Sequence, residues 1–139
     1  MTSVNLYQDK TITANTLYTL SVDVNVQNWA GGGKGWDAEL LLFTGSYASP
    51  TLLGTGALSG TIADAGGESG WQSATASFSS GNSPTGNVWI GLQRGAASQT
   101  EYTYMWFDNV VLNATAVPEP AALTLLGLGG LVLLRRRRR

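Results

Sequence analysis

Two tryptophans and a carboxylate lie close together around a glycine-rich segment. Trp29 and Trp36 flank residues 30–35, which read AGGGKG, and Asp37 follows. Flat aromatic faces stack on sugar rings while nearby carboxylates hydrogen-bond hydroxyl groups, so we take Trp29, Trp36 and Asp37 as candidate glycan contacts. The alternative is that both indoles pack within the loop or the core. The other tryptophans lie in strand-like apolar stretches and are expected in the core: Trp71, Trp89 and Trp106.

Two other chemical interpretations of this region are weaker. Asp37 and Glu39 alternate along an expected strand and would share a face, as a pair of acid and base groups must. Surface carboxylates in an acidic domain are usually solvated, so catalysis is not expected. Lys34 follows three glycines as in a phosphate-binding loop, but Ser or Thr does not follow it and no helix is expected there.

The residue types that are missing exclude several classes of protein. The chain has no cysteine and no histidine, so disulfides, thiolate catalysis, serine triads of the usual kind and histidine-ligated zinc sites are excluded. Residues 1–117 carry three basic residues against eight acidic ones. Such a body cannot neutralise a row of phosphates, so nucleic acid is not expected as a partner.

The body reads as strands and not as helices. The clearest signal is the alternation of Tyr18, Leu20, Val22, Val24 and Val26 with polar residues, which predicts a half-buried strand. Short strands without intervening helices indicate an all-β, antiparallel sandwich. Turn-rich segments lie at residues 31–35, 45–50, 64–70 and 79–86. The strands are expected at residues 4–7, 18–26, 38–43, 57–62, 71–78, 88–94 and 105–112.

The last part of the chain changes composition sharply. Residues 121–134 read AALTLLGLGGLVLL, without a charge, and five arginines follow. As a helix this run spans about 21 Å against a bilayer core of about 30 Å, and flanking arginines can snorkel to extend its reach. Clustered arginines stay on the cytoplasmic side, so the body is expected outside. An apolar helix docked on the domain is the alternative, although it would have no solvent face.

These features define a membrane anchor and its stop signal. The sequence predicts a single short C-terminal transmembrane helix. Its anchor residues are Ala121, Leu125, Leu126, Leu128, Leu131, Leu133 and Leu134. The cytoplasmic stop is formed by Arg135, Arg136, Arg137, Arg138 and Arg139.

Residues 117–120 read Val-Pro-Glu-Pro, ahead of the apolar run and the arginines. This order resembles the PEP-CTERM sorting domain. The resemblance implies that a membrane-embedded exosortase recognises Pro118, Glu119 and Pro120 and cleaves near them. It further implies anchoring in the inner membrane before processing, and then transfer to the surface or matrix of a bacterium that makes exopolysaccharide and biofilm. The two prolines favour an extended segment at the membrane face.

The body resembles jelly-roll, galactose-binding-like domains found in carbohydrate-binding modules. The matching stretches are YTLSVDV, AELLLF, WQSATASF, VWIGLQ and, most characteristic, the closing WFDNVVL of residues 106–112. The resemblance implies a structural calcium whose carboxylate is Asp108, since hard cations favour oxygen ligands. The alternative is that Asp108 accepts backbone hydrogen bonds at a strand edge. No cofactor is otherwise required.

The sequence therefore divides into a β-sandwich at residues 1–115 and a sorting signal at residues 116–139. The chain is expected to lack its export signal, because residues 1–15 contain no apolar signal core. The resemblance to jelly-roll domains implies that the sandwich also lacks its opening strand. We expect an exported, non-catalytic surface or matrix protein that binds polysaccharide. A structural or adhesive exoprotein without a glycan ligand is the alternative, and a small glycan-acting enzyme is a weaker one.

Overall fold

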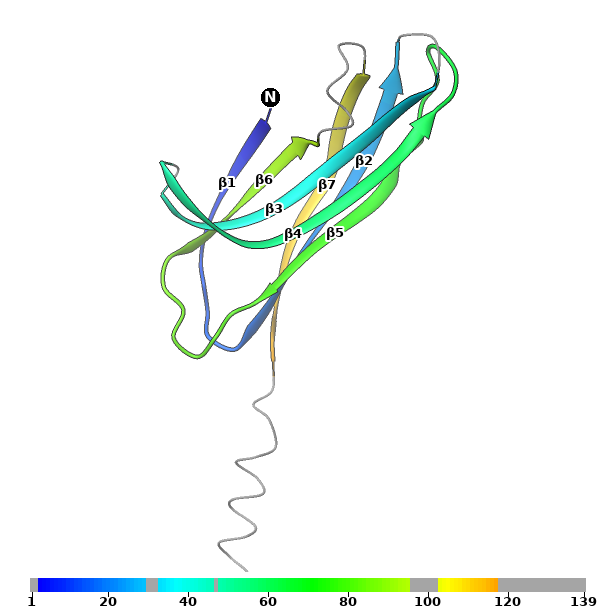
Figure 1. Ribbon diagram of the computed structural model, residues 1–139. Coiled ribbons are helices and arrows are strands. Elements are labelled where there is room, and N and C mark those ends of the chain that lie inside the picture. Colours follow the sequence, from blue (N-terminus) through cyan, green and yellow to red (C-terminus); the bar gives the residue numbers. More distant parts are fainter. Residues whose placement is uncertain (1–2, 30–32, 47, 96–102, 118–139) are drawn as a thin grey trace, which may run out of the picture.

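The chain forms two antiparallel sheets that pack face to face. The computed structural model describes residues 3–29, 33–46, 48–95 and 103–117 (Figure 1). In this part of the chain one sheet has four strands in the order β1-β6-β3-β4, and the other has three in the order β5-β2-β7. The strands are β1 (Ser3–Thr11), β2 (Thr16–Asn28), β3 (Lys34–Ser46), β4 (Ser49–Ile62), β5 (Gln72–Ser79), β6 (Asn87–Arg94) and β7 (Thr103–Ala116).

The all-β, antiparallel prediction is confirmed, and each expected strand is present. Most strands are longer than their apolar cores suggested, because pairing continues past the last buried residue. The predicted turn at residues 45–50 is the clearest difference. There the β3–β4 ladder continues to the pair Ser46 and Ser49, and Gly45 has a positive φ of 88° that few other residues adopt. The predicted turn is therefore present but shorter, since only residues 47 and 48 lie between the two strands.

Most connections run between the sheets and not within them. Only β3 and β4 are neighbours both in sequence and in a described sheet, and every other connection passes from one sheet to the other. Such crossing connections are typical of Greek-key sandwiches. They bring the end of β2 and the start of β7, far apart in sequence, to the same end of one sheet (Figure 1).

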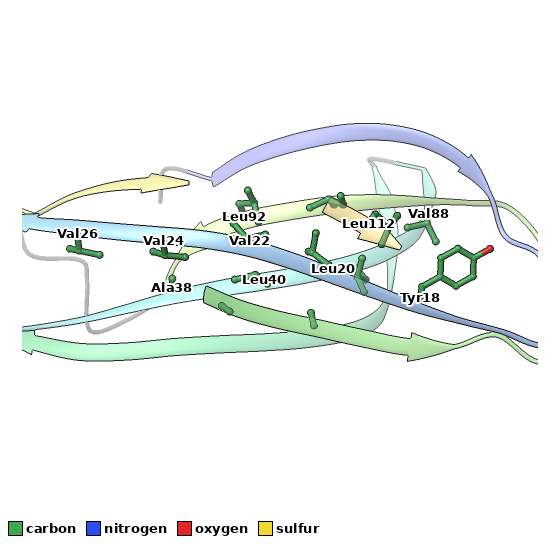
Figure 2. Close-up of a cluster of buried hydrophobic side chains, with 14 of the residues drawn as sticks. Tyr18, Leu20, Val22, Val24, Val26, Ala38, Leu40, Val88, Leu92 and Leu112 are labelled. Carbon is green, nitrogen blue, oxygen red and sulfur yellow. The ribbon is translucent and has the colours of Figure 1, made fainter. Parts of the chain in front are cut away.

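The core is built around the alternation of β2. Tyr18, Leu20, Val22, Val24 and Val26 are at most 1% exposed. Figure 2 shows these side chains directed towards residues of the opposite sheet. Their partners include Ala38, Leu40, Val88 and Leu92. Burial of each large apolar side chain stabilises the fold by about 1.5–3 kcal/mol, so this one strand anchors the sandwich.

Glycines on β4 close one side of the sandwich. Gly54 and Gly56 face β5 so closely that a Cβ atom on either would overlap the backbone carbonyls of Ser77 and Thr75. Only glycine lacks a Cβ. Gly54 and Gly56, two residues apart on the same face of β4, therefore let the edge strands of the two sheets approach along their backbones.

The opposite side, at β7, is less covered. β7 pairs with β2 along one edge, and no second neighbour is present among the described residues. Its inward side chains Met105, Phe107 and Val110 pack against the core but stay partly exposed. β7 is therefore an edge strand that carries part of the core on its inner face and solvent on its outer face.

Candidate functional site

Exposed aromatic side chains gather at one end of the β5-β2-β7 sheet. Trp29, directly after β2, is 61% exposed, and Tyr104 and Trp106 near the start of β7 are 57% and 41% exposed. The pair Asn28 and Thr103 joins the two strands at this end. We call Trp29, Tyr104 and Trp106 the aromatic row. Contiguous exposed apolar groups of this kind mark interaction sites on soluble domains.

Each ring of the aromatic row contacts the next one: Trp29 contacts Tyr104, and Tyr104 contacts Trp106. The ring centroids of Trp29 and Tyr104 are 6.2 Å apart at an interplanar angle of 78°, so these two rings meet edge to face. Tyr104 and Trp106 are 6.4 Å apart at only 22°, so their planes are nearly parallel. Strand alternation explains this second pair, since residues two apart on β7 point to the same face. The row therefore offers two similarly oriented rings and a third that stands across them.

Polar groups lie beside the aromatic row on β2. In the β2–β7 register Asn25 is opposite Trp106, and Gln27 is opposite Tyr104. Asn25 is 7% exposed, and its Nδ2 donates to Glu68 Oε2 at 3.2 Å while its Oδ1 accepts from Ser69 Oγ at 3.3 Å. These bonds hold an amide and a carboxylate in fixed positions next to the rings.

A loop secures this end of the sheet. Residues 63–71 run beside β2, where the Ser69 N–H donates to the Val26 carbonyl at 2.8 Å and the Asn28 N–H donates to the Gly67 carbonyl at 2.9 Å. The buried Asn28 Nδ2 also donates to the Ile62 and Asp64 carbonyls, both at 3.4 Å. The loop thus continues the line of β5 and keeps the polar groups beside the row in place.

Trp71 ends that loop and adds a fourth exposed ring. It is 54% exposed and directly precedes β5, where Gln72 pairs with Val24. Ser73 and Thr75 point outward on β5, and the same alternation assigns Trp71 to the outer side. The expectation that Trp71 and Trp106 belong to the core is wrong, since both are exposed. Trp89 is buried at 6%, stacked on Phe43 with centroids 4.5 Å apart.

The structure does not bring together the three residues chosen as glycan contacts. Trp29 is exposed, but Trp36 is 2% exposed and packs in the core against the backbone of Gly60. Trp36 is therefore a packing residue and not a surface contact. Asp37 is half-buried on the outer face of the other sheet, where its carbonyl accepts from the Gly95 N–H at 3.0 Å.

Sequence reasoning missed Tyr104 and misplaced Trp36, although signals for both were present. Trp36 has the same strand parity as Ala38 and Leu40, whereas the other parity begins with Asp37 and Glu39. That alternation points Trp36 inward. Tyr104 lies two residues before Trp106, so any argument that exposes one ring exposes the other.

Asp37 and Glu39 share the outer face of their sheet, as their spacing predicts. Glu39 accepts a hydrogen bond from the Gln93 side chain on the neighbouring β6, and both carboxylates are half-buried. Neither lies on the sheet that carries the aromatic row. The pair gives no specific support to an acid and base role, and the absence of catalysis remains a prediction.

Asp108 lies at an irregularity in the β2–β7 ladder. It is exposed, its Oδ1 accepts the Asn109 N–H at 2.7 Å, and Asn109 has a positive φ of 49°. Among the described residues no three acidic, histidine or cysteine side chains come together around a point that could hold a metal ion. Calcium binding at Asp108 therefore remains a prediction.

Asp23, paired with Asp108 across the ladder, is the better connected carboxylate. It accepts hydrogen bonds from Ser73 Oγ at 2.5 Å and from Asn109 Nδ2 at 2.7 Å. The Ser73 bond first, and then the Asn109 bond, lower the pKa of Asp23 below its usual value because both stabilise the charged form. This network holds the irregularity in the β2–β7 ladder just beyond the aromatic row.

Comparison with known proteins assigns the end of the chain. The family described as PEP-CTERM protein-sorting motif matches residues 116–139. No curated protein and no solved structure matches the chain. The motif supports a sorted, exported protein that is anchored in the membrane before processing by exosortase-type machinery.

The sorting residues themselves lie outside the described part of the chain. These are Pro118, Glu119 and Pro120, the anchor residues of 121–134, and the arginines of 135–139. The described residues contain no helix long and apolar enough to cross a membrane. The predicted C-terminal transmembrane helix falls in residues 121–134 and so remains a prediction.

Proposed function

We propose that this chain is an exported bacterial surface or extracellular-matrix protein, and that its β-sandwich binds polysaccharide without catalysing a reaction. The observation that carries the binding proposal is the aromatic row of Trp29, Tyr104 and Trp106, which is exposed on one sheet of an otherwise well-packed sandwich. A purely structural protein would have its large aromatic side chains in the core, whereas here three of the five tryptophans are more than 40% exposed.

The chemistry of the row suits a sugar polymer. The faces of aromatic rings carry partial negative charge, and the C–H groups on a pyranose face carry partial positive charge, so the two attract when stacked. Adjacent ring centroids lie 6.2 and 6.4 Å apart, a spacing comparable with the size of one sugar unit. Several rings in sequence suit a chain better than a single sugar.

The polar neighbours of the row suit hydroxyl groups. The Asn25 amide and the Glu68 carboxylate are already joined by a hydrogen bond, and Gln27 lies opposite Tyr104. Preformed polar groups beside an apolar surface fix the orientation of a ligand at a low entropic cost. The aromatic row would supply affinity, and these side chains would supply orientation.

The strand order supports a jelly roll. An eight-stranded jelly roll has two sheets of four strands, and the described strands form one sheet of four and one of three. A further strand beside the free edge of β7 would complete the second sheet and cover Met105, Phe107 and Val110. We propose this architecture for the domain.

The position of the row suits a protein that is anchored at its far end. Trp106 lies near the start of β7 and Ala116 ends the strand, a separation of about 34 Å at 3.4 Å per residue. The sorting motif follows directly. With residues 121–134 as the membrane helix and the arginines inside, the row would lie at the end of the domain that is farther from the bilayer.

Polysaccharide co-sedimentation tests this proposal. Wild-type protein is incubated with insoluble neutral and acidic polysaccharides, beside Trp106→Ala and Tyr104→Ala. Stacking of a nucleobase on one ring contributes about 1–3 kcal/mol, which corresponds to roughly five- to 150-fold in affinity, so each substitution should weaken binding at least about fivefold. Leu52→Ala is the matched control, since Leu52 is 52% exposed but lies on the other sheet.

The outcomes separate the candidate functions. Loss of binding in the two ring variants but not in Leu52→Ala, with melting temperatures unchanged, supports polysaccharide binding through the row. Wild-type protein that binds no polysaccharide would reject it in favour of a structural or adhesive exoprotein. Release of reducing sugar by wild-type protein would favour an enzyme.

A further inference from the structure

The last residues before the sorting motif are still part of the sheet. In the β2–β7 ladder Thr115 pairs with Leu17, and Ala116 pairs with Thr16. The Val117 N–H then donates to the Asn15 carbonyl at 2.7 Å. We call residues 113–117 the exit segment. Its backbone is held up to the residue before Pro118, so no free linker separates the folded domain from the motif.

The exit segment is held by backbone hydrogen bonds alone. Each of its five side chains is exposed, and the first buried side chain before it is Leu112, which is 9% exposed. β7 has a single neighbour among the described residues, so the segment can separate from β2 without disturbing another strand. Local opening of such edges, with few buried apolar contacts, lies at the low end of the stability scale.

Backbone N–H and C=O groups that a protease must bind are already hydrogen-bonded in this ladder. Proteases bind a substrate as an extended strand whose backbone N–H and C=O groups pair with the enzyme. In the folded domain some of those groups of the exit segment already pair with β2 and Asn15. A membrane-embedded enzyme that cuts near residues 118–120 would meet a folded sandwich and not a free strand.

We propose that the exit segment is part of the processing site, and that it leaves β2 to enter the exosortase-type enzyme. Leu112 marks the limit of the opening, because separation beyond it would expose the core. Release of five residues frees about 17 Å of extended chain. The proposal rests on processing at the sorting motif and is independent of polysaccharide binding.

A disulfide across the ladder tests the proposal in the full chain. Leu17→Cys with Thr115→Cys joins two exposed, paired positions on the outer face, at a Cα separation that antiparallel pairs share with disulfides. The chain has no cysteine of its own, so no other bridge can form. The matched control is Ser21→Cys with Val111→Cys, which pins the same two strands on the core side of Leu112.

Conversion of the precursor to the processed form is followed on gels, in membranes that carry the processing enzyme. The oxidised Leu17 and Thr115 pair should remain unprocessed, and reductant should restore processing, whereas the oxidised Ser21 and Val111 pair should be processed as wild type. Processing of the oxidised exit-segment pair at the wild-type rate would overturn the proposal, and so would equal loss in both pairs.

A second change separates release of the segment from a general effect of the bridge. Six Gly and Ser residues inserted between Val117 and Pro118 supply a free strand in place of the exit segment. In the oxidised Leu17 and Thr115 variant this insertion should restore processing. Continued failure to process would contradict the proposal, because the bridge would then act by another route.

Discussion

The indole of Trp36 lies directly on the backbone of Gly60, its partner across the β3–β4 ladder, where a Cβ atom would come within 2.9 Å of three ring atoms. The indole of Trp36 therefore occupies space that a side chain at residue 60 would need. This contact explains why a tryptophan beside a glycine-rich loop is a core residue in this domain.

Gly60→Ala should destabilise the fold by about 1–3 kcal/mol, because the added methyl group must displace a buried ring in a packed core. Urea denaturation measures the change. Gly35→Ala is the control on the partner strand, since a Cβ there meets nothing within 4 Å and Gly35 is exposed. Equal midpoints for the two variants would contradict the packing described here.

Gly56→Ala should cost more than Gly60→Ala. The added Cβ would overlap the Thr75 carbonyl, which belongs to the backbone and cannot rotate away as a side chain can. The two edge strands would have to separate, so we expect a loss above about 3 kcal/mol or failure to fold. Circular dichroism and thermal melting measure the effect; an unchanged melting temperature would show that β4 and β5 do not approach this closely.

Asn25→Ala should loosen the loop at residues 63–71. The substitution removes the bonds to Glu68 and Ser69 and should cost about 1 kcal/mol. Hydrogen exchange at the Ser69 amide, which donates to Val26, should accelerate. Gln27→Ala is the comparison, and protection at Ser69 that falls equally in both variants would remove the specific role of Asn25.

The decrease in the free energy of unfolding at acid pH should depend on Asp23. Its pKa is lower in the folded state than the usual 3.8, so its hydrogen bonds stabilise the fold above that value, and the effect is lost as the pH falls through the lowered pKa. Asp23→Asn should flatten this part of the stability curve.

The same carboxylate offers a direct titration. Ser73→Ala removes the largest cause of the shift and should raise the pKa of Asp23 towards its usual value, as measured by NMR. Asn109→Ala should raise it less. A larger effect from Asn109 would reverse the order of the two hydrogen bonds.

The strands could be predicted well where apolar and polar residues alternate, because such a pattern shows which face of the strand is buried. From Tyr18 to Val26 in β2 every second residue is apolar and the others are polar, so the buried face could be predicted directly. Residues 104–107, Tyr-Met-Trp-Phe, are aromatic or apolar in both phases, and periodicity cannot choose between them. Pairing with β2 makes that choice and exposes Tyr104 and Trp106.

The candidate site was harder to predict than the fold, because it combines segments distant in sequence. Trp29 was recognised from its place beside a glycine-rich loop, but its contact with Tyr104 depends on the crossing of chains between the sheets. The support of Asn25 by Glu68 likewise depends on a loop 43 residues away. Neither contact can be inferred from the spacing of neighbouring residues in the sequence.

Tyr104 and Trp106 lie near the beginning of β7, Trp29 lies beside them after the end of β2, and the sorting residues 118–120 follow the end of β7. If the row binds a polysaccharide and the tail is anchored as proposed, a pull on the polymer would pass through the domain to the end of β7. The part of this load that enters at Trp29, after the end of β2, would reach β7 through the β2–β7 bonds, which lie perpendicular to the strands and would be loaded together as shear. The β2–β7 ladder would thus resist a pull between the proposed binding site and the proposed anchor.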